Sequence, residues 1–341
     1  MGEGARGLLR LDDLHRLRDA GLIPAGRFVE AAARLRDGRR WEAWGRRALL
    51  AAGLAHLLAG VIFFFAFNWA DLTPMAKFAL LGGGAGAAAV TAILARLDSP
   101  AGQGLLISAS VLLGALLAVI GQVYQTGADT YELFAFWALL ILPWVAASRS
   151  AAHWVLWLTV TGLALWSYGA DLLVATNRLS WEALTAAVAM VPALGLAARE
   201  AALERGWSWL GGGWVRLLLL GAALALAIVP ALAFVLGGSI GIAETGAVGL
   251  LALAAIAGSA LGAYMRLLPD RHAVVLAVIA VALVVAAAGG RALDEGIGFA
   301  SGSTAQTVAS LALLVPWLLL VFAAAAVAVR RMRGSIALQT G

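Results

Sequence analysis

Stretches of about 20 mostly apolar residues alternate with short polar stretches along most of the chain. A helix rises 1.5 Å per residue, so about 20 residues cross a hydrocarbon core of ~30 Å. Ten membrane-spanning helices are predicted, over 48–68, 75–95, 104–124, 131–148, 151–169, 181–198, 214–236, 246–265, 272–290 and 305–329. Two residues join the fourth and fifth spans and the sixth contains Pro192, so eight spans is the alternative count.

Composition supports a membrane protein. Of the 341 residues, 62% are hydrophobic and 13% are charged, whereas a soluble domain carries about 25% charged residues. A water-soluble fold cannot bury that much apolar surface. The predicted fold class is therefore an all-α, polytopic transmembrane helix bundle. The chain has no cysteine, which excludes disulfides, thiolate catalysis and thiolate metal sites.

The basic residues predict the orientation, because Lys and Arg are retained on the cytoplasmic side. Eleven of the 24 precede the first span, and ten more fall on the same side if the ten spans alternate. Lys77, Arg178 and Arg291 fall on the other side. This predicts a bacterial inner-membrane protein with both termini in the cytoplasm. No basic stretch is interleaved with base-stacking aromatics, so no nucleic-acid partner is expected.

The polar N-terminal segment predicts two short helices over residues 7–38, around a break at 21–24. Apolar residues recur at helical spacing, so the pair is expected to form a small cytoplasmic helical hairpin. Six arginines follow or end it, and such a cluster attracts anionic lipid at roughly 1 kcal/mol per charge; retention of the N-terminus inside is the competing interpretation. The predicted division is 1–47 (hairpin and basic juxtamembrane segment), 48–330 (transmembrane domain) and 331–341 (cytoplasmic tail).

Two glycine pairs have the GxxxG spacing that lets membrane helices approach closely, Gly82 with Gly86 and Gly258 with Gly262. We expect both to pack helices within the chain. A dimer face is the alternative, so a homo-oligomer is left open.

Polar side chains concentrate in two short turns on the predicted periplasmic side. The candidate ligand-binding residues are Asn68, Trp69, Asp71, Lys77, Gln122, Tyr124, Gln125, Asp129, Glu132 and Trp137. Consecutive hairpins commonly pack as neighbours, so we expect the two turns to meet, with Lys77 close to a carboxylate. The structural alternative is that these side chains cap helix ends, because backbone groups cannot be left bare in lipid.

His56 is a further candidate, because it lies eight residues into the first span, roughly 12 Å deep. An ionisable side chain at that depth is costly and commonly functional. Ser108 and Ser110 are expected at comparable depth as hydrogen-bond partners. A proton relay is the functional interpretation, and a packing histidine is the structural one.

The turn motifs also carry a family resemblance. An Asn-Trp turn follows the first span, Gly-Gln-Val-Tyr-Gln-Thr-Gly-Ala-Asp occupies 121–129, and Glu-Leu-Phe-Ala-Phe-Trp leads to Pro143. With these motifs the chain resembles bacterial predicted membrane proteins of domain-of-unknown-function family 2157, over roughly residues 8–150. The resemblance implies a multi-pass membrane protein and brings no established activity.

Three functions are compatible with these observations. The first is a membrane protein that binds or moves a small polar solute or a lipid headgroup at the periplasm-facing turns. The second is an intramembrane enzyme acting on a lipid-linked substrate, with Asp71, Asp129 or Glu132 as acid, base or metal ligand. The third is a non-catalytic scaffold or accessory subunit, with a membrane-protein partner. Ligand or solute handling is the prediction, no cofactor or resident metal is expected, and the bilayer is the expected partner.

Overall fold

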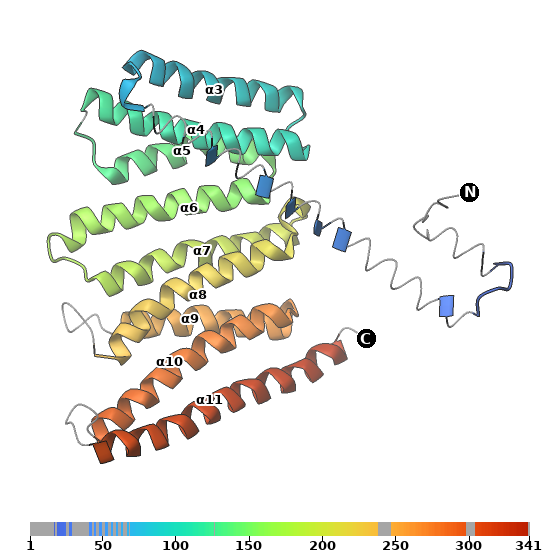
Figure 1. The fold of residues 1–341 in the computed structure, drawn as a ribbon, viewed down its shortest axis with the longest axis vertical. Helices are drawn as coiled ribbons and strands as arrows, with labels where there is room; N and C mark the ends of the chain where they lie inside the picture. Colours follow the sequence, from blue (N-terminus) through green and yellow to red (C-terminus); the bar gives the residue numbers. More distant parts are fainter. Residues whose placement is uncertain are drawn as a thin grey trace, which may run out of the picture. The chain divides into compact units, whose positions relative to one another are not determined.

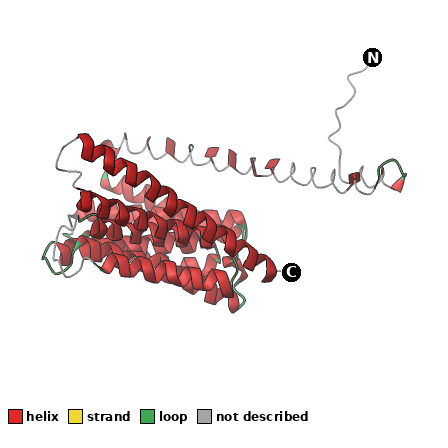
Figure 2. Ribbon diagram, turned by 90° about the horizontal axis from the view of Figure 1, so that it is seen from below, coloured by secondary structure: helices red, strands yellow, loops and turns green. Residues whose placement is uncertain are grey.

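The computed structural model describes residues 69–125, 127–237, 247–297 and 304–339, together with single residues and short stretches between 17 and 67. The chain divides into two compact units, 1–73 and 74–341, and each is described by itself. The described residues are helical or in turns, without a strand (Figure 2).

The second unit is a succession of helices (Figure 1). They are α3 (Pro74–Leu94), α4 (Pro100–Tyr124), α5 (Thr130–Ser148), α6 (Ala151–Tyr168), α7 (Trp181–Glu204), α8 (Gly213–Val235), α9 (Val248–Gly262), α10 (Arg271–Ile297) and α11 (Thr304–Gln339). The π-helical segments η2 (Gly169–Val174) and η5 (Ala263–Leu267) extend α6 and α9, and η3 (Ser208–Leu210) lies between α7 and α8.

Each predicted span from residue 75 onward coincides with one of these helices. Eight helices or helix parts in the described residues are long and apolar enough to cross a membrane: α3, α4, α5, α7, α8, α9 with η5, α10, and 312–330 of α11. α6 falls outside this group, since its three tryptophans and His153 make it less apolar, although it packs between α5 and α7. The first predicted span lies largely outside the described residues. The count of ten therefore stays a prediction.

The least regular predicted boundary, between the fourth and fifth spans, is a sharp helix-to-helix turn. α5 ends at Ser148, its C-cap Arg149 has a left-handed φ of 45°, and Ser150 is the N-cap of α6. A left-handed residue stops one helix and frees the chain to reverse. The two residues are thus enough to separate two helices that pack against each other.

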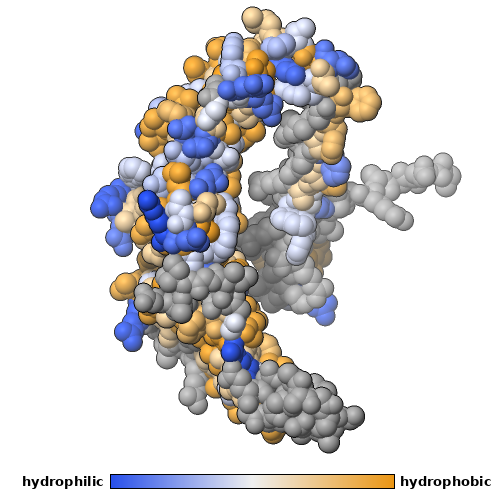
Figure 3. All heavy atoms as spheres, turned by 90° about the vertical axis from the view of Figure 1, so that its left-hand side faces the viewer, coloured by the Kyte–Doolittle hydropathy of each residue, from blue (hydrophilic) through white to orange (hydrophobic). Residues whose placement is uncertain are grey.

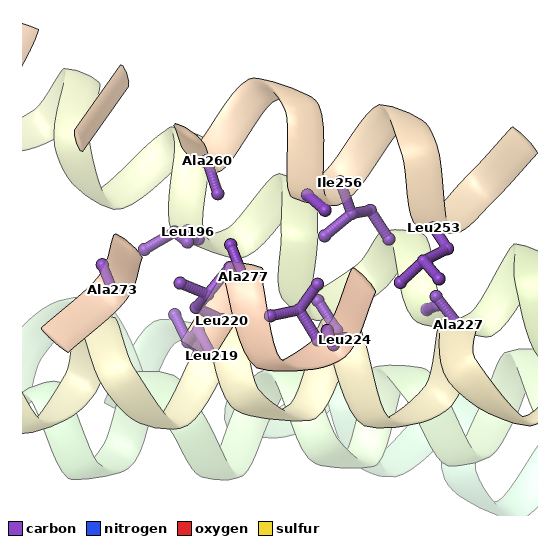
Figure 4. Close-up of a cluster of buried hydrophobic side chains, with 14 of the residues drawn as sticks. Leu196, Leu219, Leu220, Leu224, Ala227, Leu253, Ile256, Ala260, Ala273 and Ala277 are labelled. Carbon is purple, nitrogen blue, oxygen red and sulfur yellow. The ribbon is translucent and has the colours of Figure 1, made fainter. Parts of the chain in front are cut away.

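Packing order follows chain order, since each helix of the second unit contacts the next (Figure 1). α7 also contacts α9, and α8 contacts α10. The main hydrophobic core lies among these four helices, where leucines of α7 and α8 meet Leu253 and Ile256 of α9 and alanines of α9 and α10 (Figure 4). Small residues let membrane helices approach closely, where no hydrophobic effect drives them together.

One of the glycine predictions is wrong. Gly258 and Gly262 are exposed, and a Cβ added at either would meet nothing within 4 Å. Close approach occurs at other glycines: a Cβ at Gly114 would overlap the indole of Trp137, and one at Gly289 would overlap Trp317. Close packing against glycine therefore occurs where a tryptophan ring lies on the helix, and it does not occur at Gly258 and Gly262.

In the first unit, the described residues show the predicted break. Leu17 is helical, Gly21 has a φ of 72°, and the chain is helical again at Arg27 and Phe28. The N–H of Leu22 donates to the carbonyl of Leu17 at 2.9 Å. The rest of the predicted hairpin and most of the arginine cluster lie outside the described residues. The unit ends in the short 3-10 helix η1 (Trp69–Asp71).

Candidate functional site

The predicted periplasmic cluster is distributed over both units. Trp69 and Asp71 belong to η1 of the first unit, Lys77 lies in α3 of the second, and Asn68 lies outside the described residues. The expectation that the two turns meet therefore stays a prediction. At the end of the second unit where α3, α5 and α7 begin, hydrophilic side chains are spread over several helix ends (Figure 3).

The residues of the second turn serve as helix ends. Gln125 has a left-handed φ of 44° and its N–H donates to the carbonyl of Gly121, which ends α4. The N–H of Asp129 donates to Glu132 Oε2 at 3.2 Å, which begins α5 with a capping box. Gln122 and Tyr124 are exposed, and the Tyr124 ring stacks on Phe78 with centroids 5.8 Å apart.

Trp137 lies deeper than the turn, about 12 Å along α5 from Asp129. Its Nε1 donates to the backbone carbonyl of Ser110 in α4 at 2.8 Å. The indole lies over Gly114 of the same helix. Trp137 therefore joins α4 to α5.

His56 and the two serines expected beside it have separate partners. His56 Nδ1 lies 2.8 Å from the carbonyl of Ala52 one turn earlier. The hydroxyl of Ser108 donates to the carbonyl of Gly104, and the Ser110 hydroxyl lies 2.8 Å from His153 Nε2. Both serines thus have partners within the second unit.

His153, near the start of α6, is a buried histidine. Its side chain is fully buried, and its two ring nitrogens lie 2.8 Å from the Ser110 hydroxyl and 3.0 Å from the Ser148 hydroxyl. Ser148 also donates to the carbonyl of Val145, so it accepts from Nδ1–H, and Ser110 donates to Nε2. The network joins α4, α5 and α6.

The densest charged cluster lies at the opposite end of the helices from the predicted turns. Glu200 near the end of α7 accepts from Arg199 NH1 at 2.6 Å, from Arg216 of α8 at 2.9 and 3.2 Å, and from the Tyr264 hydroxyl of η5 at 3.0 Å. Arg216 also donates to Asp270 at 2.8 Å and lies over the Tyr264 ring, 5.0 Å from its centroid. We call these five residues the ionic cluster.

The charges of the ionic cluster balance, two arginines against two carboxylates. Arg199 is 1% exposed, donates a second bond to the carbonyl of Gly212, and has an Nε without a partner among the described residues. A buried charge is tolerated when it is paired and hydrogen-bonded. The cluster therefore fixes the ends of α7 and α8 and the segment that leads from η5 to α10.

Asp270 also caps α10, since Oδ1 accepts from the backbone N–H groups of His272 and Ala273 at 2.9 and 3.2 Å. Burial alone raises the pKa of this carboxyl. Hydrogen bonds from Arg216 and from these two backbone groups outweigh burial, so the pKa of Asp270 lies below its usual value. The carboxylate is therefore charged at neutral pH.

A cavity of about 340 Å³ borders the ionic cluster between α7, α8 and α9. Its wall is mostly alanine and leucine, and its polar side chains are Glu200, Glu204, Ser259 and Tyr264. Glu200 is saturated by the bonds described above. Glu204 is exposed at the end of α7 and forms no ion pair with a described residue. The described residues contain no group of three or more His, Asp or Glu side chains placed to hold a metal ion.

Residues 15–154 match the family model described as "Predicted membrane protein (DUF2157)". The resemblance is confirmed. The match agrees with the apolar helices of the structure, and the chain is a membrane protein. No curated protein and no solved structure matches the chain.

The matched residues end within α6, so the ionic cluster and its cavity lie beyond the family match. Sequence reasoning treated their arginines as markers of orientation. One signal was present: Arg199 and Glu200 are adjacent within an apolar stretch, and neighbouring charges in a membrane helix need partners.

Proposed function

We propose that this membrane protein binds a small amphipathic cation in the cavity between α7, α8 and α9. The observation that supports this most is an apolar cavity of about 340 Å³ with a carboxylate, Glu204, that has no cationic partner among the described residues. Ligand sites are commonly concave, mostly apolar and supplied with a few polar groups that orient the ligand.

The two glutamates have different tasks in this proposal. Glu200 holds four hydrogen bonds and keeps the wall rigid, so it has no capacity left for a ligand. Glu204, one turn later, attracts the positive group of the ligand. The apolar part of the ligand lies against Leu220, Ile256 and Leu267. The balanced charge of the ionic cluster leaves Glu204 as the group that sets the sign of the ligand.

The periplasm-facing turns are a less favoured site for a solute or lipid headgroup. Gln125, Asp129 and Glu132 take part in ending α4 and beginning α5. These groups already take part in capping bonds, and a ligand that used them would have to replace those bonds. This supports the structural interpretation of the turns over ligand binding.

A binding experiment on the full-length protein in micelles tests the cavity. Benzyltrimethylammonium is the probe, and its uncharged isostere neopentylbenzene is compared with it. We expect the cation to stabilise the protein against heat more than the isostere does. Glu204→Gln is expected to weaken binding of the cation by roughly fivefold, since a solvated ion pair contributes about 1 kcal/mol.

Asp98→Asn is the matched control, because Asp98 is 69% exposed at the same end of the helices and does not line the cavity. It should leave binding of the cation unchanged. Equal binding of both probes, or unchanged binding of the cation by Glu204→Gln, would contradict the proposal.

We further infer that the protein crosses a bacterial inner membrane ten times with both termini in the cytoplasm, which puts the ionic cluster at the cytoplasmic end. The support is the placement of 21 of the 24 basic residues on one side. Reporter fusions after Pro100, Ala202 and Ser335 should report cytoplasm, and fusions after Gly127 and Ala175 should report periplasm. A reversal that begins after Arg149 would show that α5 and α6 are not two crossings.

A further inference from the structure

Helix α8 carries a row of side chains at four-residue spacing that lines two adjoining hollows. The row is Trp214, Leu218, Ala222 and Leu226. One hollow, of about 950 Å³, lies between α8 and α10; the other, of about 500 Å³, lies between α8, α6 and α7. Leu218 lines both. The two hollows therefore adjoin at Leu218 along α8, and together they are called the groove.

The part of the groove between α6, α7 and α8 is apolar. Its walls are leucine, valine, alanine, proline, glycine and tryptophan, with Thr159 as its polar residue. The hydroxyl of Thr159 donates to the carbonyl of Val155 within its own helix, so its hydrogen is already bonded. Trp214 and Leu226 are separated by about 18 Å along α8, close to half of a ~30 Å hydrocarbon core. These dimensions and this chemistry suit one leaflet's length of acyl chain.

The part between α8 and α10 carries positive charge. Arg271 and His272 begin α10, line this hollow and are exposed. Arg271 forms no ion pair among the described residues, while Asp270 beside it is bound by Arg216 at 2.8 Å. His272 Nδ1 lies 3.8 Å from Asp270. The carboxylate nearest the hollow is thus already balanced by another arginine.

Trp214 stands at the same end of the groove and is 51% exposed. Tryptophan prefers the headgroup level of a membrane, where its ring is half in lipid and its N–H reaches water. Its position indicates that Arg271 and His272 lie at that level too. An arginine and a histidine at headgroup level above an acyl-chain groove match a lipid that carries a negative phosphate.

We propose that this groove holds one anionic phospholipid. Its phosphate lies at Arg271 and His272, and one acyl chain follows α8 from Leu218 to Leu226 between α6 and α7. The site is separate from the cavity proposed for a cation, which lies between α7, α8 and α9. Its ligand is also opposite in charge, so the two proposals stand or fall independently.

The test compares lipids on the delipidated full-length protein in micelles. Phosphatidylglycerol and phosphatidylcholine with the same acyl chains are added, and lipid retention is measured by native mass spectrometry. We expect phosphatidylglycerol to be retained preferentially. Arg271→Gln should weaken its retention about tenfold, the loss expected when one charge-assisted hydrogen bond is removed, and Arg271→Lys should restore part of it.

Arg266→Gln is the matched control, because Arg266 is exposed at the same end of the helices and does not line the groove. Ala222→Phe fills the apolar part and should weaken retention of both lipids. If Arg271→Gln and Arg266→Gln weaken retention of phosphatidylglycerol equally, the lipid is held by general surface charge and the proposed site is wrong. If inorganic phosphate displaces bound phosphatidylglycerol as strongly as added lipid does, the acyl chain does not contribute to binding and the proposal is wrong.

Discussion

Replacing Glu200 by glutamine removes the carboxylate charge that Arg199 contacts at 2.6 Å. The side chain keeps its shape, and its amide oxygen can still accept hydrogen bonds. The ionic cluster changes from balanced to a net charge of +1, because Asp270 is then the one carboxylate in a cluster with two arginines. Arg199 cannot reach water to compensate, since it is 1% exposed. The perturbation therefore tests whether the cluster stabilises the ends of the helices.

The expected loss follows from the burial of the pair. Breaking a buried ion pair by removing one partner costs about 3–5 kcal/mol, because the other charge is left uncompensated. Here Arg216 keeps its bond to Asp270, and Glu200 is 14% exposed rather than fully buried. We therefore expect the free energy of unfolding to fall by about 3 kcal/mol, the lower end of that range.

The free energy of unfolding is measured on purified full-length protein in mixed micelles titrated with a denaturing detergent. Glu204→Gln is the control, since this carboxylate is exposed one turn later and should change stability by less than about 0.5 kcal/mol. A second variant, Arg199→Met combined with Glu200→Leu, replaces the pair by apolar groups and should lose less than Glu200→Gln alone. Equal small losses from Glu200→Gln and Glu204→Gln would refute the reasoning.

Three further outcomes are expected in the same unfolding assay. Gly114→Ala should lower stability by about 1–3 kcal/mol, because its Cβ overlaps the Trp137 indole, whereas Gly104→Ala in the same helix meets nothing within 4 Å and should be neutral or stabilising; equal effects would contradict the packing. His153→Leu should cost about 1–3 kcal/mol by removing the partner of the buried Ser110 hydroxyl, and an unchanged stability would exclude that network as a stabilising one. Because the pKa of Asp270 is lower in the folded protein than its unfolded value of about 3.9, its carboxylate stabilises the fold above that pH. This stability is lost as the pH falls through the folded pKa. Asp270→Asn should therefore weaken the acid dependence of the free energy of unfolding below about pH 4, and an acid profile identical to that of the unchanged protein would contradict this.

The helices were predictable because few backbone conformations are stable in a membrane. Apolar length alone sets where α3 to α11 lie, since every backbone group in the hydrocarbon must be satisfied within its own helix. The ends were less predictable. α7 runs past the predicted boundary at 198 to Glu204, and α11 runs past the predicted boundary at 329 to Gln339, because hydrogen bonding continues a helix after its apolar stretch has ended.

The pairing of polar groups could not be read from the sequence. Ser110 was expected near His56 because the two lie at similar depth, yet its hydroxyl bonds to His153. Depth is set by position within a span, whereas pairing depends on which faces of which helices meet. A single sequence therefore indicates the depth of a polar side chain but contains almost no information about its partner.

The arginines show why this distinction matters for function. Arg199, Arg216 and Arg271 entered the orientation argument as equivalent charges on one side of the membrane. The structure gives them different surroundings: Arg199 is buried against Glu200, Arg216 bridges Glu200 and Asp270, and Arg271 is exposed in the groove beside α8. A positive-inside bias constrains their number and side but not their partners. Charges required for insertion can therefore also bind ligands, and the arginines to test first are those without a partner among the described residues.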